Sequence, residues 1–211
     1  MPSRTASPQM TMLPTVVDCA EGTVRQFAQQ PFYGHNRLRV SRLSKVFITH
    51  MHGELACMLI FKFIRIYPTK HLGRSTADHT MGLTTLLRTL LGIPPAHSPL
   101  TSTPLHARAP PSVELYGPPG LRALLRATLT LTRTRSVQTY AVHELLGPGD
   151  VPSATCGGEE AHESECVGRD VRCDEEGVWR GVVDVEEGRG RRRVVVDAAP
   201  IEHRGAHRLL D

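Results

Sequence analysis

The sequence lacks the paired cysteines that organise a disulfide framework or a cysteine zinc knuckle. It has five cysteines, an odd number, and none stands in a CxxC pair: Cys19, Cys57, Cys156, Cys166 and Cys173. Both kinds of site need cysteines in pairs. Free thiols in a reducing, intracellular compartment are therefore the simpler interpretation.

A membrane-spanning segment and an internal repeat are also lacking. The most apolar run, Leu55 to Phe61, ends at Lys62 and is far shorter than the roughly 20 residues that a spanning helix needs. No membrane partner is therefore expected. The first seventeen residues contain no acid and include Arg4. A transit peptide has this composition, so a mitochondrial location stays open beside the nucleus and the cytoplasm.

The 211 residues suffice for a single domain with a hydrophobic core. Their net charge of +4 is compatible with a phosphate-bearing partner, although most such charges are solvated surface. Short apolar runs predict strands at 15–18, 45–50, 113–116, 140–145, 178–185 and 193–197. Strands that alternate with helices indicate the α/β class.

Two leucine stripes predict amphipathic helices at about 80–91 and 119–131. Leucines recur at helical spacing in both, so we expect them to face inward: Leu83, Leu86, Leu87, Leu90 and Leu91 in the first, and Leu121, Leu124, Leu125 and Leu129 in the second. The stretch 93–112 is rich in Pro, Ser and Thr and predicts a loop. The stretch 147–177 is acidic and glycine-rich and predicts a mobile loop.

Histidines and an aspartate stand where metal ligands are often found. His50 and His52 are two residues apart at the end of a predicted strand, and imidazole suits Zn²⁺. Asp78 and His79 open the first leucine-striped helix. If residues 54–77 are passed over, the chain reads HxHxDH followed by that helix. Such a set supplies ligands for two metals, which together can activate a hydroxide and neutralise a phosphoryl centre.

This joined motif resembles the signature of the metallo-β-lactamase fold, and four further segments resemble the tRNase Z family in its short form. They are DCAEGT at 18–23, YGPPGL at 116–121, VHEL at 142–145 and PIEHR at 200–204. The segments follow the family order over most of the chain. The resemblance implies an αββα sandwich and a zinc-dependent endoribonuclease that cuts precursor tRNA after the discriminator nucleotide to remove the 3′ trailer.

The resemblance also implies roles for individual residues. One zinc ion would be bound by His50, His52 and His203, and a second by Asp78 and His79, with Asp78 also the expected general base. Glu21, Gly22 and Thr23 would lie near the site and bind substrate, and His143 would be structural. Family members often dimerise, so a homodimer is also expected.

The sequence departs from the family pattern in two places. Residues 54–77 separate ligands that must share one site, and we expect them to leave the sheet as a poorly packed excursion. A retained intron would explain this atypical insert. The domain, taken as 1–211, also lacks the family's opening strand and glycine-rich loop, and its later bridging aspartate and final histidine.

These departures keep other interpretations open. Because ligands are missing or separated, we expect this literal chain to bind zinc weakly and not to process precursor tRNA. One alternative to an enzyme is a nonfunctional fragment from a mis-spliced gene, or at most an RNA-binding remnant. Another interpretation is a different hydrolase of the same fold, acting on a thioester, a sulfate ester or a lactam.

Overall fold

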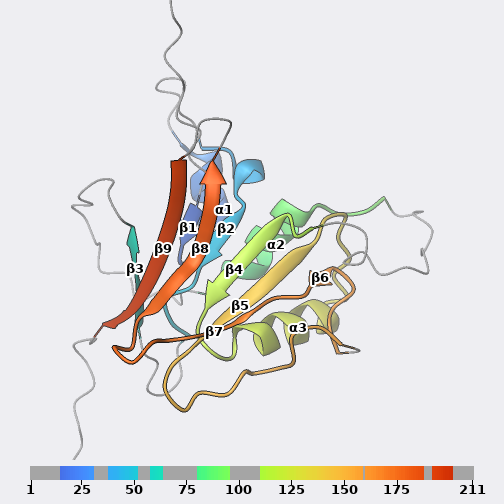
Figure 1. Ribbon diagram of the computed structural model, residues 1–211. Helices are drawn as coiled ribbons and strands as arrows, with labels where there is room; N and C mark the ends of the chain where they lie inside the picture. The colour runs from blue at the N-terminus through green and yellow to red at the C-terminus, as the bar shows by residue number, and fades with distance from the viewer. Residues whose placement is uncertain are drawn as a thin grey trace, which may run out of the picture.

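The computed structural model describes residues 15–30, 38–51, 58–63, 80–95, 110–158, 160–187 and 192–201. They form two sheets and a layer of helices (Figure 1). None of the helices in these ranges is both long and apolar enough to cross a membrane.

The larger sheet is parallel throughout. Its strands are β1 (Thr15–Val17), β2 (Lys45–Phe47), β4 (Val113–Gly117), β5 (Tyr140–Leu146), β6 (Glu165–Cys166) and β7 (Asp170–Arg172). The order is β1-β2-β4-β5, and β6 and β7 both pair with β5. Because all pairs are parallel, the carboxyl ends of β1, β2 and β4 meet at one edge of the sheet.

Helices cover one face of this sheet. They are α1 (Thr23–Ala28), the 3-10 turn η1 (Val40–Arg42), α2 (Leu83–Leu91) and α3 (Leu121–Leu131). The stripe of α2 is buried as predicted, at Leu83, Leu86, Leu87, Leu90 and Leu91. It packs against Val46, Ile48, Leu115 and Val142 of the sheet to form the first core.

The stripe of α3 differs from the prediction at one position. Leu121, Leu125 and Leu129 are buried, but Leu124 is 39% exposed. The second buried row of the helix is occupied by Arg122 and Arg126, which are buried because carboxylates meet them. These two arginines rotate the buried face of α3 away from Leu124.

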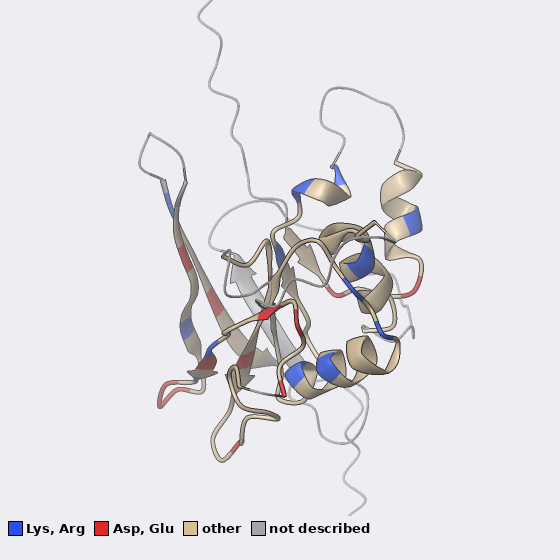
Figure 2. Ribbon diagram, turned by 90° about the vertical axis from the view of Figure 1, so that its right-hand side faces the viewer, with Lys and Arg blue, Asp and Glu red and all other residues tan. Residues whose placement is uncertain are grey.

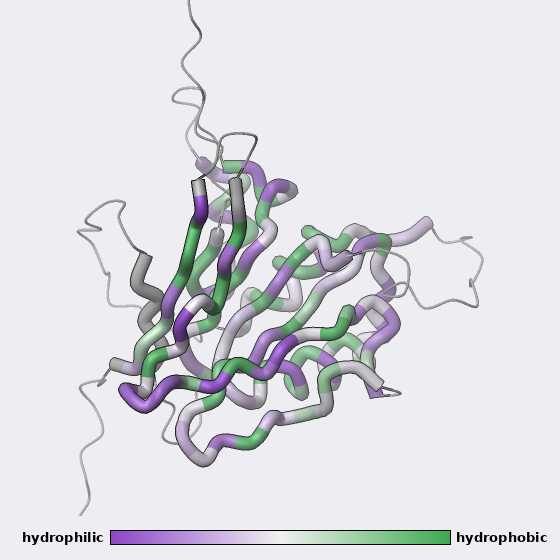
Figure 3. The backbone as a smooth tube through the Cα atoms, viewed as in Figure 1, coloured by the Kyte–Doolittle hydropathy of each residue, from purple (hydrophilic) through white to green (hydrophobic). Residues whose placement is uncertain are grey.

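A second, antiparallel sheet covers the other face. Its order is β3 (Met58–Phe63), β9 (Arg192–Ile201) and β8 (Trp179–Glu187). A second core fills the space between the sheets, with Phe47, Tyr116 and Leu145 from one side and Trp179, Val182 and Val196 from the other. Figure 3 shows apolar stretches along strands of both sheets. The described residues thus form helix, sheet and sheet layers, and the predicted α/β class is confirmed.

Two segments expected to be irregular contain strands. Met58–Phe63, within the 54–77 insert, pairs with β9 from Met58↔Ile201 to Phe63↔Val196. The expectation of a poorly packed excursion is therefore wrong for these six residues, since the backbone of β9 offers them an open sheet edge. The remainder of the insert lies outside the described residues. Likewise 147–177 includes β6 and β7, which the ion pairs of Arg126 and Arg122 attach to α3.

Candidate metal centre

The shared carboxyl edge brings together segments that are distant in sequence. Asp18 directly follows β1, and His50 lies three residues beyond β2. The turn 118–120 follows β4 and leads into α3. Binding sites in α/β folds commonly lie just beyond the carboxyl ends of parallel strands.

A chain of hydrogen bonds runs from Asp18 to His50. The Thr49 backbone N–H donates to Asp18 Oδ1 at 2.8 Å, and Thr49 Oγ1 lies 2.9 Å from each carboxylate oxygen. The same Oγ1 lies 3.0 Å from Nδ1 of His50. Asp18 reaches this position with a positive φ of 59°, a conformation that aspartate tolerates better than most residues, and its N–H donates to Phe47 O at 2.7 Å.

These hydrogen bonds favour one tautomer of His50. The Thr49 hydroxyl has one proton, and the carboxylate of Asp18 can only accept, so the hydroxyl donates to Asp18. Oγ1 then accepts a hydrogen bond from Nδ1–H of His50. The neutral imidazole carries its lone pair on Nε2, the arrangement found where a histidine binds a metal and a neighbour orients its ring. His50 is only 9% exposed, so the ring is fixed by packing as well.

The loop after β1 bends tightly beside this chain. Thr23 donates from Oγ1 to Ala20 O at 2.7 Å, and its N–H lies 3.2 Å from the same oxygen. Gly22 has a φ of +86°, which favours glycine. Glu21 is exposed, whereas Gly22 and Thr23 are half-buried. All three are at the carboxyl edge, and their role in substrate binding stays a prediction.

The start of α2 is pressed against the same loop. Gly82 N–H donates to Cys19 O at 2.8 Å, and a Cβ at Gly82 would lie 2.1 Å from Ala20 O. Only glycine fits there, because the obstacle is backbone. Thr80, the residue directly after His79 in sequence, therefore belongs to a segment anchored to the Asp18 loop.

Only part of the predicted ligand set lies in the described chain. His50 is described, whereas His52, Asp78, His79 and His203 lie outside the described residues. Within the part that is described, no group of three or more His, Cys, Asp or Glu side chains could hold a metal. The proposed ligand set therefore stays a prediction apart from the placement of His50.

Cys19 packs in the core although it lies beside Asp18 in sequence. Its side chain is fully buried, and burial raises the pKa of its thiol to about 11, with Thr23 opposing this change and Asp18 adding to it. The thiol thus serves as a packing group of the first core.

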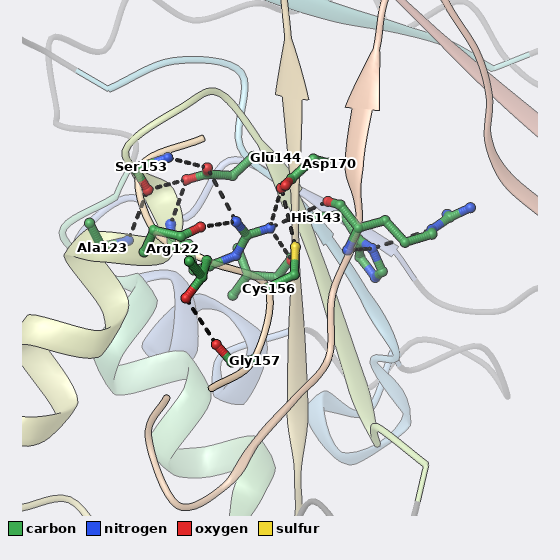
Figure 4. Close-up of polar contacts among 12 residues, drawn as sticks. Arg122, Ala123, His143, Glu144, Ser153, Cys156, Gly157 and Asp170 are labelled. Atoms are coloured by element: carbon green, nitrogen blue, oxygen red, sulfur yellow. Dashed lines mark hydrogen bonds and ion pairs between the residues drawn. The ribbon is translucent and has the colours of Figure 1, made fainter. Parts of the chain in front are cut away.

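A buried carboxylate, which the sequence analysis did not single out, shapes the next loop of the edge. Oε1 of Glu144 accepts hydrogen bonds from the N–H groups of Gly120 and Arg122, both at 3.0 Å, and from Ser153 Oγ at 2.5 Å. Ser153 N–H donates to Oε2 at 2.8 Å. Figure 4 shows Glu144 and Asp170 beside the Arg122 guanidinium, whose Nη2 lies 2.7 Å from Asp170 Oδ1.

The Glu144 contacts support the residues around His50. They hold the turn at Gly120, where a Cβ would lie 2.6 Å from Cε of Met51. Ile48 is tied to the same strand end, since its N–H donates to Tyr116 O at 2.8 Å. The sequence contains a signal for this buried contact. Glu144 in VHEL and Arg122 after YGPPGL are opposite charges in apolar surroundings.

His143 lies between the two sheets, beside Tyr116. Its ring stacks on Tyr116 with centroids 4.5 Å apart, and Nδ1 accepts from the Arg169 N–H at 3.1 Å. Nε2 lies 3.4 Å from Glu114 Oε1, without hydrogen-bond geometry. This contact, followed by the ion pair with Lys45, lowers the pKa of Glu114 to about 2 against the opposing effect of burial. These contacts support the structural interpretation of His143.

Comparison with known proteins identifies relatives for most of the chain, although no family model matches it. The chain is 32% identical over 171 residues to zinc phosphodiesterase ELAC protein 1 of Bos taurus, a match that covers 81% of this chain and 35% of that protein. It is 32% identical over 133 residues to ribonuclease Z of Synechococcus sp. (strain WH7803), covering 63% of this chain and 28% of the relative.

A solved structure of human tRNase Z, short form, aligns with a TM-score of 0.46 and 26% identity, over 88% of this chain and 52% of that one. The chain spans about a third of the length of the curated relatives it matches. On the sequence matches to these zinc phosphodiesterases and ribonucleases Z, the chain belongs to the tRNase Z family.

Proposed function

We propose that this chain acts in the zinc-dependent endonucleolytic removal of the 3′ trailer from precursor tRNA. The names of its relatives, zinc phosphodiesterase and ribonuclease Z, support a phosphodiester in RNA as the substrate. The structural observation that carries the proposal is the Asp18–Thr49–His50 chain at the carboxyl edge of the sheet. Through these hydrogen bonds, Nε2 of His50 carries the lone pair with which an imidazole binds a metal.

His50 and the groups behind it fit one ligand position of a zinc centre. Imidazole is a preferred zinc ligand, and a hydroxyl and a carboxylate behind it are typical outer partners. We assign His50, His52 and His203 to one zinc ion and Asp78 and His79 to a second. When bound, zinc supplies a Lewis acid and lowers the pKa of a water molecule to near neutrality.

The chain's own residues position the reactants. Thr49 and Asp18 hold the His50 ring in one orientation, and the backbone bond from Gly82 to Cys19 O joins α2 to the loop that carries Asp18. In the proposal Asp78 moves the proton of the attacking water. In the proposal the RNA is contacted by three residues on the loop that also carries Asp18: Glu21, Gly22 and Thr23.

Arginines and lysines outside the edge would bind RNA phosphates. A duplex RNA stem is recognised mainly by its shape and backbone, so this binding would vary little with the sequence of the stem. It would also weaken as salt is added, because each neutralised phosphate releases counterions.

Two zinc ions and a homodimer complete the proposal, both from the family resemblance. Metal analysis of the purified chain should give two equivalents of zinc, and sedimentation should give twice the mass of one chain. A metal-free protein would contradict the first expectation, and a monomer at all concentrations the second.

A trailer-cleavage assay tests the proposed function. The chain should cut a precursor tRNA after the discriminator nucleotide, and both a chelator and His50→Asn should abolish cleavage. His162→Asn is the matched control: His162 is also 9% exposed, but it bonds Thr134 O at the far end of α3 and should retain cleavage. An inactive chain, or cleavage that survives His50→Asn, would contradict the proposal.

A further inference from the structure

The helical layer has an unusual charge distribution. Its described residues, 22–30, 38–44, 80–95 and 118–139, contain no Asp or Glu. The same ranges present six exposed arginines: Arg25, Arg39, Arg42, Arg88, Arg133 and Arg135. Figure 2 shows the basic residues on these helices. A surface of one sign raises the local concentration of partners of the opposite sign.

Three of these arginines line one pocket. It has a volume of about 240 Å³ and lies between the carboxyl ends of α2 and α3, where Arg88, Arg133 and Arg135 meet the hydroxyl-bearing residues Thr132 and Thr134. The pocket has no acidic lining residue. Its charge and hydroxyl groups match a phosphate, which accepts hydrogen bonds from both.

The arginines are not needed to cap the two helices. Leu91 O, at the end of α2, already accepts from the N–H groups of Val137 and Gln138 at 3.1 and 3.0 Å. At the end of α3, the N–H groups of Arg133 and Thr134 donate to Thr130 O and Leu129 O. Among the described residues no ion pair or side-chain hydrogen bond engages Arg88, Arg133 or Arg135.

The backbone of Arg133 adds an independent observation. Its φ is +48°, and its hydrogen bonds are those of a Schellman cap, in which this position is usually glycine. An L-residue pays about 1–2 kcal/mol in this conformation. Backbone strain of this kind tends to persist where a side chain has a function.

We propose that this three-arginine pocket binds a phosphate of the RNA backbone, as a second RNA contact remote from the metal centre. The inference rests on the proposed function for the identity of the nucleic acid. Because α2 begins at the carboxyl edge and rises about 1.5 Å per residue over its 9 residues, the pocket is about 13 Å along the helix from that edge. It therefore binds RNA without taking part in cleavage.

Binding of a precursor tRNA, measured by fluorescence anisotropy across a range of salt, tests the inference. All variants carry His50→Asn, so that cleavage does not interfere. The triple change R88Q/R133G/R135Q should weaken binding on the order of tenfold and lower the salt slope by about 1, as expected for the loss of one phosphate contact. The control R172Q/R180Q/R193Q removes the same charge from exposed arginines outside the helical layer and should change both values much less.

The single variant Arg133→Gly separates function from stability. Glycine suits the positive φ, so the melting temperature should stay equal or rise while RNA affinity falls. A fall in melting temperature with unchanged RNA affinity would overturn the inference in favour of a structural arginine. Equal losses in the two triple variants would also overturn it, since the effect would then be net charge alone.

Inorganic phosphate distinguishes the source of the bound group. It should compete with RNA for the parent chain at millimolar concentrations and have little effect on the R88Q/R133G/R135Q variant. Phosphate binding that depends on the three arginines, without any change in RNA affinity, would overturn the inference in favour of a small-anion site. A parent chain that fails to bind RNA would refute both the inference and the proposed substrate. If the chain with His50 intact cleaves precursor tRNA but the R88Q/R133G/R135Q change leaves RNA binding unaffected, only the inference is refuted.

Discussion

At the scale of single residues, one hydroxyl decides what His50 can do. Thr49 Oγ1 lies between the Asp18 carboxylate and Nδ1 of His50, and the single hydroxyl proton gives the hydrogen bonds a direction. Without that hydroxyl, the ring would lose both the bond that selects its tautomer and one of its orienting contacts. The carboxylate would retain its bond from the Thr49 N–H.

Thr49→Val tests this role because it removes the hydroxyl and preserves the shape of the side chain. Zinc affinity should fall about 10- to 100-fold, the usual cost of losing an outer partner of a histidine ligand. Thr139→Val is the matched control, a buried threonine whose Oγ1 donates instead to Pro110 O. Equal zinc affinities for the two variants, measured by competition with a chelator, would contradict the role of Thr49.

Glu114 predicts a pH dependence of stability. Its pKa is lowered from an ordinary 4.5 to about 2, chiefly by His143 and then by Lys45. A lowered carboxyl pKa stabilises the folded state above the unfolded pKa, and this stabilisation is lost as the pH falls from about 4.5 toward 2. Urea unfolding should show Glu114→Gln less stable than the parent at pH 7, with a difference that shrinks across this window. A difference independent of pH would contradict the assignment.

At the scale of elements, the carboxyl edge is built by close backbone contact. The loop 18–23, the start of α2 and the turn at Gly120 meet where only small residues fit. Gly82 is the tightest of these contacts, with a φ of −80° that any residue can adopt. Its glycine is therefore required by space and not by backbone conformation.

Gly82→Ala should consequently separate α2 from the Asp18 loop. The added Cβ would meet backbone at Ala20 O, and overpacking of this kind costs about 1–3 kcal/mol. Zinc affinity should fall with stability, since the loop that carries Asp18 must move. Gly147→Ala is the control, because its added Cβ meets only the movable Asp150 side chain. Equal free energies of unfolding and equal zinc affinities for Gly82→Ala and Gly147→Ala would contradict the importance of this contact.

Elements with strong local patterns could be predicted from the sequence. β2, β4, β5 and the α2 stripe follow the predicted runs closely, because burial on one or both faces leaves a clear periodicity. β3, β6 and β7 could not be predicted, since each is defined by a partner strand that is remote in sequence. Leu124 was misassigned because helical spacing does not reveal that paired arginines occupy the neighbouring buried row.

The candidate site was predictable only in part, for a similar reason. His50 follows a strand whose buried pattern is evident, so its place at the edge could be predicted. The Asp18–Thr49 bonds and the Glu144 contacts depend on how three loops meet at one edge. The spacing of residues along the sequence does not reveal which loops come into contact, so these hydrogen bonds could not be predicted.

At the scale of the whole molecule, two cores share the larger sheet. One lies under the helices and the other between the sheets, and Phe47 and Tyr116 stack in the second with centroids 5.0 Å apart. In Figure 1, β4 and β9 both descend toward the lower part of the view, where β9 ends at Ile201. β9 thus ends on the side of the molecule where β4 ends.

Hydrogen exchange can test the place of β3 in this architecture. Because Met58–Phe63 pairs with β9, the amides that face β9 should exchange slowly, whereas those on the outer edge should exchange fast. The resulting alternation is specific to an edge strand. Uniformly fast exchange through these residues would contradict the pairing and restore the interpretation of a poorly packed excursion.

The most direct test of the central claim is a zinc titration of the chain and of His50→Asn, with His162→Asn as the control for folding. The Asp18–Thr49–His50 chain predicts that His50→Asn weakens zinc binding by at least about 10- to 100-fold, since a ligand matters no less than its outer partners. His162→Asn should bind zinc as the parent does. Equal zinc affinity for the parent and His50→Asn would contradict a metal centre at this edge of the sheet.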